Sequence, residues 1–402
     1  MSTKHSKAAA EFLKNKKQAA WHDETLWLVR AKRDRLSKEV PEWEELRNMA
    51  CATKLYSNSH LDELLVEFEN NARANGAHVY WAKDADEYCN IVYNILNQHG
   101  VKHFIKSKSM LAEECELNPF LENKGIEVVE SDLGERILQL MHLKPSHIVL
   151  PAIHIKREQV GELFEREMGT EKGNFDPTYL THAARKNLRQ KFIHAEAAMT
   201  GANFAVASTG EIVVCTNEGN ADMGTSQPKL QIAAFGMEKI VPDRESLGVF
   251  TRLLARSATG QPITTYTSHY RKPREGGELH IIIVDNGRSK ILADQKHIKT
   301  LNCIRCGACM NTCPVYRRSG GYSYTYFIPG PIGINLGMLK APLHYYDNVS
   351  ACSLCYSCSF VCPAKVDLAE QIYLWRQDLD KLGKADRMKR VMSGGMEFID
   401  RK

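Results

Sequence analysis

The stretches CIRCGACMNTCP (303–314) and CSLCYSCSFVCP (352–363) share one pattern, Cys-x2-Cys-x2-Cys-x3-Cys-Pro, with equivalent cysteines 49 residues apart. They hold eight of the 12 cysteines in this chain of 402 residues, and the other four, Cys51, Cys89, Cys115 and Cys215, are scattered. The N-terminus has no apolar segment that would direct secretion, so we expect reduced thiols rather than disulfides. Thiols concentrated in this way indicate metal binding.

The spacing within each run is typical of proteins with two 4Fe–4S clusters. Three thiolates two residues apart can wrap one face of a cubane cluster, while the fourth, followed by Pro, leaves the loop and reaches the other cluster. We therefore expect one cluster on Cys303, Cys306, Cys309 and Cys362, and a second on Cys352, Cys355, Cys358 and Cys313. Zinc is the alternative, but structural zinc sites use two cysteine pairs and a longer spacer, which fits this repeat poorly.

Two adjacent clusters with only cysteine ligands predict an electron relay, since no iron is left open to a substrate. The first run has the small Gly307 where the second has Tyr356, which suggests that the two clusters differ in solvation and potential. The connector between the runs, VYRRSGGYSYTYFIPGPIG (315–333), is either a docking surface or a turn-rich segment that packs its aromatic side chains on the module.

Upstream of the cysteines, short apolar segments alternate with helical patterns and indicate an α/β domain with a mostly parallel sheet. We expect strands in AHVYWA, KHFIKSKS and IEVVES, then a further apolar segment HIVLPA (147–152), and later strands in NFAVAS, EIVVCT, LQIAAFGMEKIV and HIIIVDNGR. Helical periodicity covers 85–100, 110–125 and much of 156–200.

Both ends of the chain are expected to be helical, over about 1–60 and over 366–392, the latter with Asp367 as N-cap. Residues 1–40 contain ten Lys/Arg against five Asp/Glu, an excess that equals the net charge of +5 for the whole chain. The rest is formally neutral, which argues against nucleic-acid binding. The basic segment is either a solvated helix face or a contact for an acidic partner or membrane surface. Apolar runs are too short for a transmembrane helix.

Candidate ligand-binding residues lie where the expected strands end in polar loops. They are Lys106, Ser107 and Lys108, and, after the hairpin strands, Thr209, Asn217, Glu218, Gly219 and Asn220. The Lys-Ser segment is suited to a carboxylate or phosphate, and Glu218 is a candidate base or nucleophile. Turn formation is the simpler interpretation of the Asn and Gly residues.

His182 and His194, on one expected helix, are candidate acid–base groups, although lone helical histidines are usually structural. No GxGxxG or Walker motif supports NAD or ATP binding.

Two segments resemble one known family. The run CIRCGACMNTCPVYRRSGGYSY (303–324), the following GPIG (330–333) and the second cysteine run are similar to the lactate utilisation protein B family, and so is TGANFAVASTGEIVVCTNEGNADM (200–223). The resemblance implies an α/β domain related to ribose-phosphate isomerases and CoA transferases. It also implies a cytoplasmic system that oxidises L-lactate to pyruvate, with a cysteine-rich subunit and a smaller subunit carrying a related LUD-type domain as partners.

These observations together predict four parts: a helical segment (1–64), a LUD-type α/β domain (65–290), a ferredoxin-like domain with two 4Fe–4S clusters (291–376) and a helical tail (377–402). The expected function is an electron-transfer subunit of an NAD-independent L-lactate dehydrogenase system, because one-electron clusters alone are poor at two-electron oxidation of lactate. The alternative is an oxidoreductase in its own right, whose α/β pocket binds a hydroxy acid or CoA-like substrate.

Overall fold

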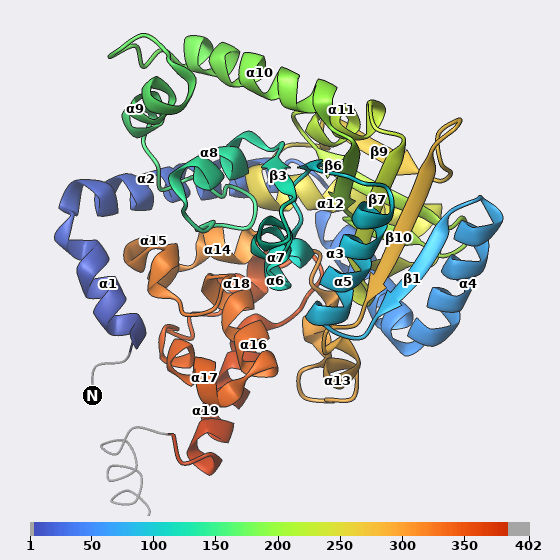
Figure 1. Cartoon of the computed structure of the whole chain (residues 1–402). Helices are drawn as coiled ribbons and strands as arrows, with labels where there is room; N and C mark the ends of the chain where they lie inside the picture. Colours follow the sequence, from blue (N-terminus) through green and yellow to red (C-terminus); the bar gives the residue numbers. More distant parts are fainter. Residues whose placement is uncertain (1–3, 385–402) are drawn as a thin grey trace, which may run out of the picture.

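The chain is described by a computed structural model that covers residues 4–384 (Figure 1). Its centre is a sheet of six parallel strands in the order β1-β10-β7-β4-β2-β3. The strands are β1 (His78–Ala82), β2 (His103–Lys106), β3 (Glu127–Glu130), β4 (Ala197–Gly201), β7 (Leu230–Gly236) and β10 (Glu278–Val284).

The sheet is buried on both faces, because its central strands are apolar at nearly every position. On β10, Ile282 and Val284 face one core with α5 (Ala85–Gln98), α6 (Met110–Glu114) and α7 (Leu117–Asn123). The alternate residues Leu279, Ile281 and Ile283 face a second core with α4 (Leu61–Ala74). The helices α8 (Leu133–Met141) and α10 (Pro177–His194) pack beside β3 and β2, and α9 (Arg157–Met168) packs against α8 and α10 away from the sheet (Figure 1).

A second, four-stranded sheet lies against the first and has the order β8-β5-β6-β9. Its strands are β5 (Phe204–Val206), β6 (Glu211–Thr216), β8 (Ile240–Val241) and β9 (Tyr266–Tyr270). The β5–β6 and β6–β9 pairs are antiparallel, whereas β5 and β8 are parallel. The helix α11 (Asn220–Ser226) follows β6, and α12 (Arg244–Thr259) packs its apolar side on this sheet through Phe250 and Leu253.

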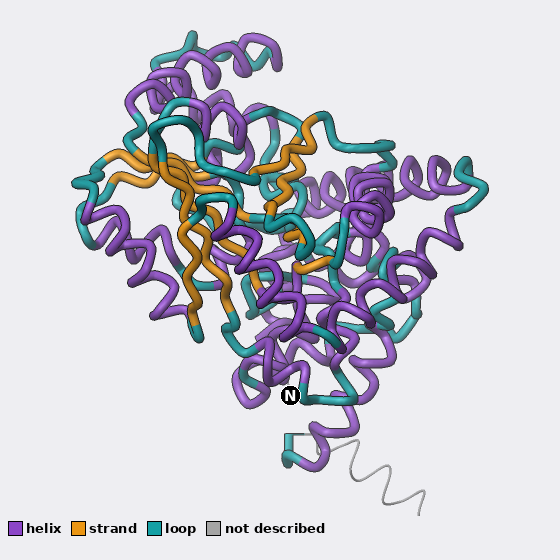
Figure 2. The backbone as a smooth tube through the Cα atoms, turned by 90° about the vertical axis from the view of Figure 1, so that its right-hand side faces the viewer, coloured by secondary structure: helices purple, strands orange, loops and turns teal. Residues whose placement is uncertain are grey.

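The strands are gathered in one part of the molecule, and the C-terminal part is helix and loop (Figure 2). Its helices are α13 (Arg288–Leu292), α14 (Ala308–Thr312), α15 (Pro314–Ser319), α16 (Gly330–Lys340), α17 (Pro342–Tyr345), α18 (Ser357–Val361) and α19 (Leu368–Lys381). Single 3-10 turns occur at Met237–Lys239, Ile298–Asn302, Gly321–Ser323 and Tyr346–Ser350.

The N-terminal helices α1 (Lys4–Lys14), α2 (Lys16–Lys38) and α3 (Trp43–Ser59) lie beside this C-terminal part, although they are far from it in sequence (Figure 1). His22 Nδ1 lies 2.8 Å from the carbonyl oxygen of Arg317, and Arg33 donates to the carbonyl oxygen of Val361 at 3.0 Å. The basic segment is therefore packed along the cysteine region and is not a free arm over residues 4–38.

The predicted fold class, a mostly parallel α/β domain followed by a cysteine-rich helical domain, is confirmed. Three expectations need correction. Residues 147–152 form turns, because the His147 ring accepts the backbone N–H groups of Val149 and Leu150 at 3.0 Å and so holds this segment in a turn. The helical pattern over 110–125 is divided into α6 and α7 at Glu116, which has φ 54°. The helical pattern expected over much of 156–200 ends at His194, and the chain continues as the buried strand β4, which was not predicted; neither was strand β9.

At the C-terminal end, Asp367 occupies the N-cap position of α19 but its side chain makes no capping hydrogen bond. The expected helix over 366–392 is present to Lys381, and residues 385–402 lie outside the described part of the chain. No helix within residues 4–384 combines the length and the apolar character needed to cross a bilayer.

Candidate iron–sulfur and ligand-binding sites

The two cysteine runs fold into loops of matching conformation. Gly307 and Tyr356, which are equivalent in the repeat, have φ 81° and 59°, and Arg305 and Leu354, the preceding equivalent pair, have φ 60° and 53°. Three non-glycine residues in this sparsely populated region indicate that each loop has a demanding shape. Each loop then leads into a five-residue helix, α14 or α18.

Backbone N–H groups donate to four of the cysteine sulfurs. Arg305 N lies 3.4 Å from Cys303 Sγ, and Leu354 N lies 3.3 Å from Cys352 Sγ at the equivalent position of the second loop. The fourth cysteines of each run behave in the same way, since Cys313 Sγ accepts from Tyr316 N at 3.5 Å and Cys362 Sγ accepts from Val366 N at 3.4 Å. These bonds favour thiolate over thiol, as cluster ligation requires.

A small cavity in the C-terminal domain is lined by four cysteines that come from both runs. They are Cys303, Cys306, Cys309 and Cys362, and the remaining lining is mostly apolar, including Ile148, Ile332, Val366 and Leu368. Four thiols that converge on one apolar space, three from one loop and one from the other, are a suitable donor set for a cubane cluster.

The other four cysteines also interact with one another. Burial, with smaller contributions from nearby Cys352 and Cys355, raises the pKa of Cys313 to about 11. Burial likewise raises the pKa of Cys358, with Cys313, Cys352 and Cys355 among the neighbours that contribute. Among residues 4–384, no three cysteine sulfurs lie within 4.8 Å of one another. Since a zinc ion with Zn–S bonds of about 2.3 Å would draw its sulfurs to about 3.8 Å apart, the donor sets fit a cluster better than zinc.

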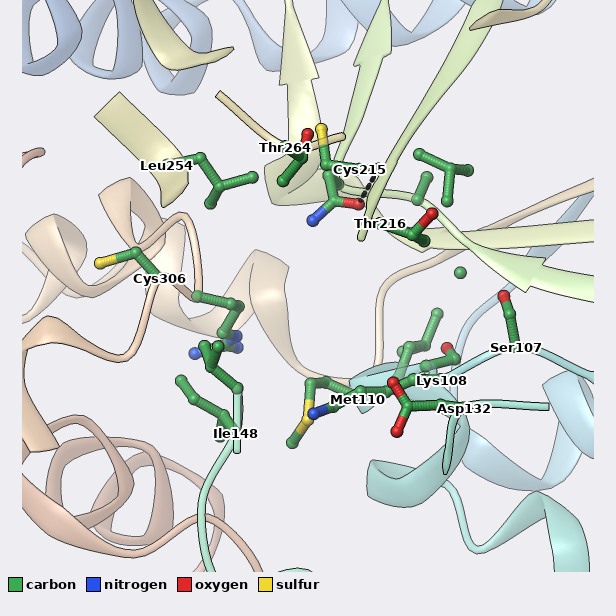
Figure 3. Close-up of a pocket in the computed structure, with 18 of the residues that line it drawn as sticks. Ser107, Lys108, Met110, Asp132, Ile148, Cys215, Thr216, Leu254, Thr264 and Cys306 are labelled. Carbon is green, nitrogen blue, oxygen red and sulfur yellow. Dashed lines mark hydrogen bonds between the residues drawn. The ribbon is translucent and has the colours of Figure 1, made fainter. Parts of the chain in front are cut away.

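A larger cavity of about 340 Å³ lies between the α/β domain and the first cysteine loop (Figure 3). It is bounded by the carboxyl ends of the parallel strands, at Ser107, Gly201 and Gly236, which is the usual ligand-binding edge of such sheets. Cys306 lies on the opposite side of the cavity from Ser107. The cavity therefore joins the α/β domain directly to a proposed cluster ligand.

Buried charges surround the side of the cavity near Cys306. Arg288 forms ion pairs with Glu114 at 3.0 Å and with Glu238. Burial alone would raise the pKa of Glu238, but the guanidinium groups of Arg288 and Arg305 outweigh it and lower the pKa to about 2. Burial lowers the pKa of Lys239 to about 8, and its side chain has no hydrogen bond or ion pair with any residue the structure describes. Arg305 Nη1 is also buried without a hydrogen-bond partner. Arg305 Nη2 lies 3.7 Å from Glu238 Oε1, so on this side Lys239 is the cationic group that no carboxylate pairs among the described residues.

Acidic groups lie elsewhere on the cavity wall, at Glu218 and Asp132. Burial raises the pKa of Glu218, and the neighbouring Asp132 carboxylate raises it further. Glu218 Oε2 accepts the backbone N–H of Leu133 at 3.3 Å. A carboxyl group with a raised pKa in a cavity is suited to proton transfer.

The structure brings together most of the candidate residues chosen from the sequence. The cavity is lined by Ser107, Lys108, Asn217, Glu218 and Asn220. Gly219 is adjacent as the N-cap residue of α11, with φ 67°, where a Cβ would lie 2.9 Å from the Tyr266 ring.

Four candidates lie outside the cavity. The Lys106 side chain is fully buried and pairs with Glu130 on the neighbouring strand at 2.6 Å, so it cannot reach the cavity. Thr209 lies in the β5–β6 turn, where its carbonyl oxygen accepts from Asn75 Nδ2 at 2.8 Å. His182 and His194 are exposed on α10 and take no part in the cavity.

Other residues have roles that the sequence did not reveal. Lys239, Arg288 and Arg305 line the cavity but come from three separate segments, and only the fold brings them together. Of the scattered cysteines, Cys89 and Cys115 are buried and Cys51 is half-buried, while Cys215 lines the cavity and burial raises its pKa to about 11. In the connector, Tyr316, Tyr324 and Tyr326 are buried in the cysteine domain, which favours the packing interpretation of that segment.

Comparison with known proteins gives two family matches that together span most of the chain. The LUD domain model matches residues 65–291, and the 4Fe-4S dicluster domain model matches residues 299–366. Lactate utilization protein B of Geobacillus thermodenitrificans is 43% identical over 357 residues, 87% of this chain and 75% of that protein. The uncharacterized electron transport protein YkgF of Escherichia coli is 41% identical over 362 residues, 88% of this chain and 76% of its own length. A solved DUF162 family protein from Deinococcus radiodurans covers 56% of this chain and 98% of its own, at 16% identity and a TM-score of 0.32.

Proposed function

This chain belongs to the lactate utilization protein B family, and from that premise we propose that it is the iron–sulfur electron-transfer subunit of a cytoplasmic multi-subunit system that oxidises L-lactate to pyruvate. The observation that carries the proposal is the apolar cavity lined by Cys303, Cys306, Cys309 and Cys362. In this proposal the chain itself is a non-catalytic member of an NAD-independent L-lactate dehydrogenase.

The proposal assigns two 4Fe–4S clusters, each held by three cysteines of one run and the fourth of the other. Cys303, Cys306, Cys309 and Cys362 hold the first, and Cys352, Cys355, Cys358 and Cys313 hold the second. Support comes from the convergence of the first four on one cavity and from the mutual proximity of the second four. When bound, such clusters supply one-electron transfer.

The protein's own residues hold and shield these sites. Arg47 Nε donates to the carbonyl oxygen of Cys362 at 3.0 Å, so α3 fixes the end of the second run from outside the cysteine domain. Arg33 on α2 fixes the preceding residue, Val361, in the same way. Apolar residues such as Ile332 and Leu368 exclude water from the first site. The N-terminal helices therefore act as a cover for the cysteine domain.

The proposal also assigns the domains of the chain and its partner subunits. We assign residues 1–64 to the N-terminal segment, whose described part is the helical cover, 65–290 to the LUD-type domain and 291–376 to the ferredoxin-like domain; most of the expected tail, 377–402, lies outside the described residues. The partners are a cysteine-rich subunit and a smaller subunit with a LUD-type domain. The support is the family membership and the similarity to YkgF of Escherichia coli, which is described as an electron transport protein.

A second candidate function is favoured by the cavity of about 340 Å³. In that case the chain is an oxidoreductase in its own right, and the α/β cavity binds a hydroxy acid or CoA-like substrate. The unpaired ammonium of Lys239 would hold the anionic group, and Glu218, with its raised pKa, would take or give a proton. Contact of the same cavity with Cys306 would place such a substrate next to the first cluster site.

One anaerobic experiment separates the two candidates. The cluster-loaded chain is purified alone, L-lactate is added, and the visible iron–sulfur absorbance is followed, with dithionite as the positive control. The electron-transfer proposal predicts bleaching by dithionite only. Bleaching by lactate that is lost in Lys239→Gln but kept in Lys299→Gln, an exposed lysine away from the cavity, would establish the second candidate instead.

A further inference from the structure

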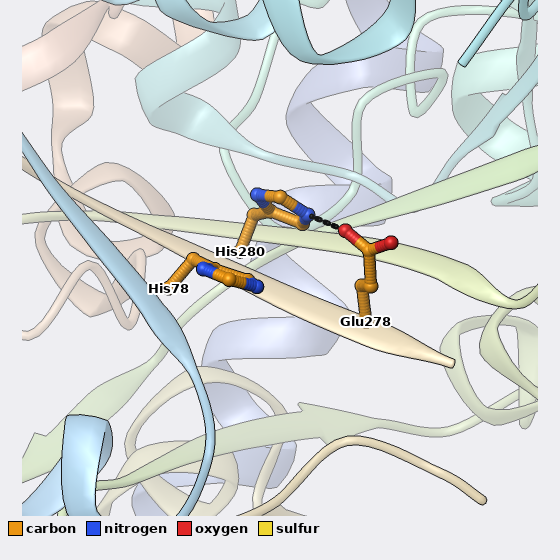
Figure 4. A group of neighbouring side chains, drawn as sticks. All are labelled: His78, Glu278 and His280. Carbon is orange, nitrogen blue, oxygen red and sulfur yellow. Dashed lines mark hydrogen bonds and ion pairs between the residues drawn. The ribbon is translucent and has the colours of Figure 1, made fainter. Parts of the chain in front are cut away.

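Three imidazoles surround one carboxylate at the end of the sheet opposite the large cavity. Figure 4 shows two of them, His78 and His280, with Glu278. His78 begins β1 and lies opposite His280 of β10 in the parallel register. Glu278 is two residues before His280 on the same strand, so both side chains stand on the same face of the sheet. His99, the C-cap residue of α5, approaches the same carboxylate.

The donor atoms of three of these residues are close enough to share one ion. The ligand atoms of His78, Glu278 and His280 all lie within 4.8 Å of one another, and His280 Nε2 is 2.9 Å from Glu278 Oε2. The rings of His78 and His280 are stacked, with centroids 4.8 Å apart. Tetrahedral zinc with bonds of about 2.1 Å needs ligand atoms about 3.4 Å apart, so small rotations of the exposed His78 and Glu278 side chains are sufficient.

His99 brings a further ring nitrogen to the same carboxylate. Its Nδ1 lies 2.8 Å from the carbonyl oxygen of Ile95, which fixes the orientation of the ring. Its Nε2 is directed at Glu278 Oε1 at 3.3 Å.

The most buried ligand is held by a further residue, as metal-binding histidines usually are. The hydroxyl of Tyr80 lies 3.1 Å from His280 Nδ1 and fixes the ring with Nε2 directed at Glu278. Such outer contacts set the tautomer and orientation of a ligating imidazole. His280 itself is buried, whereas His78 and Glu278 are open to solvent, so an ion can enter from outside.

We propose that His78, Glu278 and His280, joined by His99, form a binding site for one divalent transition metal ion of the zinc class. Imidazole nitrogen with one carboxylate oxygen is a donor set that zinc accepts, whereas magnesium and calcium prefer oxygen alone. The ion would connect β1, which is the edge strand of the sheet, to its only neighbour β10. This inference is independent of the electron-transfer proposal, since it uses none of the cysteines or cavity residues.

Zinc chloride is the probe, used on the cluster-loaded full chain after removal of loosely bound metal. We expect equilibrium dialysis to give one zinc per chain beyond any held by cysteine. Glu278→Gln and His78→Gln should each weaken binding at least tenfold, and Tyr80→Phe about tenfold, while His182→Gln, which changes an exposed histidine on α10, should have no effect.

X-ray absorption at the zinc edge separates this site from zinc in empty cysteine sites. The proposal predicts nitrogen and oxygen neighbours at about 2.0–2.1 Å, whereas cysteine ligation would give sulfur at about 2.3 Å. Sulfur-ligated zinc only, or equal zinc uptake by Glu278→Gln and His182→Gln, would overturn the proposal. Because Glu278 and His78 are exposed, their substitution leaves the fold intact.

Discussion

Replacing Lys106 by Met should destabilise the α/β domain rather than impair ligand binding. The Lys106 side chain is 0% exposed and that of its partner Glu130 is 3% exposed, with 2.6 Å between Nζ and Oε1. Glu113 and Glu135 are also close enough to favour the charged lysine. Removing one member of a buried pair costs about 3–5 kcal/mol, because the remaining charge is left without a partner.

The expected size of the effect follows from the size of the domain. For a domain of about 150–250 residues, each kcal/mol moves the melting temperature by about 2–4 °C, so Lys106→Met should lower it by about 6–20 °C. The assay is circular dichroism at one heating rate under anaerobic conditions. Lys102→Met, an exposed lysine just before the same strand, is the control and should change stability by less than about 0.5 kcal/mol.

A double variant tests the reason for the loss. Glu130→Gln removes the second charge and keeps an acceptor for Asn118, whose Nδ2 lies 2.6 Å from Glu130 Oε1. Lys106→Met combined with Glu130→Gln should therefore be more stable than Lys106→Met alone. If Lys106→Met melts like the wild type, or if the double variant loses the sum of the two single effects, the pair is not the structural element described here.

Three further predictions concern pH, backbone packing and redox potential. Burial lowers the pKa of His154 to about 4, so the unfolded chain takes up a proton at this residue below about pH 6.5, before the folded chain does. His154 alone should therefore reduce stability by about 1.4 kcal/mol between pH 7.5 and 5.5, and His154→Gln should lose about that much less than the wild type over this range; identical pH profiles would contradict this. A Cβ at Gly333 would lie 1.7 Å from the carbonyl oxygen of Ile328, so Gly333→Ala should reduce the stability of the fold by about 1–3 kcal/mol. A Cβ at Gly248 would have nothing within 4 Å, so Gly248→Ala should be neutral or stabilising in the same melting assay. Tyr356 replaces Gly307 in the second loop, so a redox titration followed by electron paramagnetic resonance should resolve two midpoints, and a single shared midpoint would refute the expected difference.

Periodicity in the sequence was sufficient for five of the six strands of the large sheet, but not for the central strand β4. Segments such as the one ending in Val284 are apolar at successive positions, and only a sheet covered on both faces buries them all. Strand β4 was missed because its sequence, AAMTG, contains mostly small residues and directly follows a helical pattern. Strand β9 was missed because its sequence, YTSHY, is polar and partly exposed, and it is held by pairing with β6. Residues 147–152 look like a strand, but their apolar side chains pack against the cysteine domain.

The site residues were predictable where they are close in sequence, as in the cysteine runs, or where they follow the ends of expected strands, as Ser107 and Glu218 do. The cysteine spacing repeats within short segments, so its chemistry can be recognised without a fold. Lys106 was misassigned because its partner Glu130 lies on a neighbouring strand, and an isolated Lys-Ser segment gives no sign of it. Lys239 and Arg305 were missed because they lie far apart in the sequence, in two different domains. They line the same cavity as Cys306 only once these domains have packed together.

The most direct test of the two-cluster arrangement is the iron and sulfide content, with resonance spectra, of paired cysteine variants. The proposed exchange of fourth ligands predicts that Cys362→Ser resembles Cys303→Ser, each losing about half of the iron, and that combining them causes no further loss. Cys362→Ser combined with Cys352→Ser should instead lose both clusters. The contradicting result is that Cys362→Ser behaves like Cys352→Ser, so that the cluster of the second run is lost while the cluster on Cys303 remains. Each run would then hold its own cluster, and the exchange of fourth ligands would be wrong.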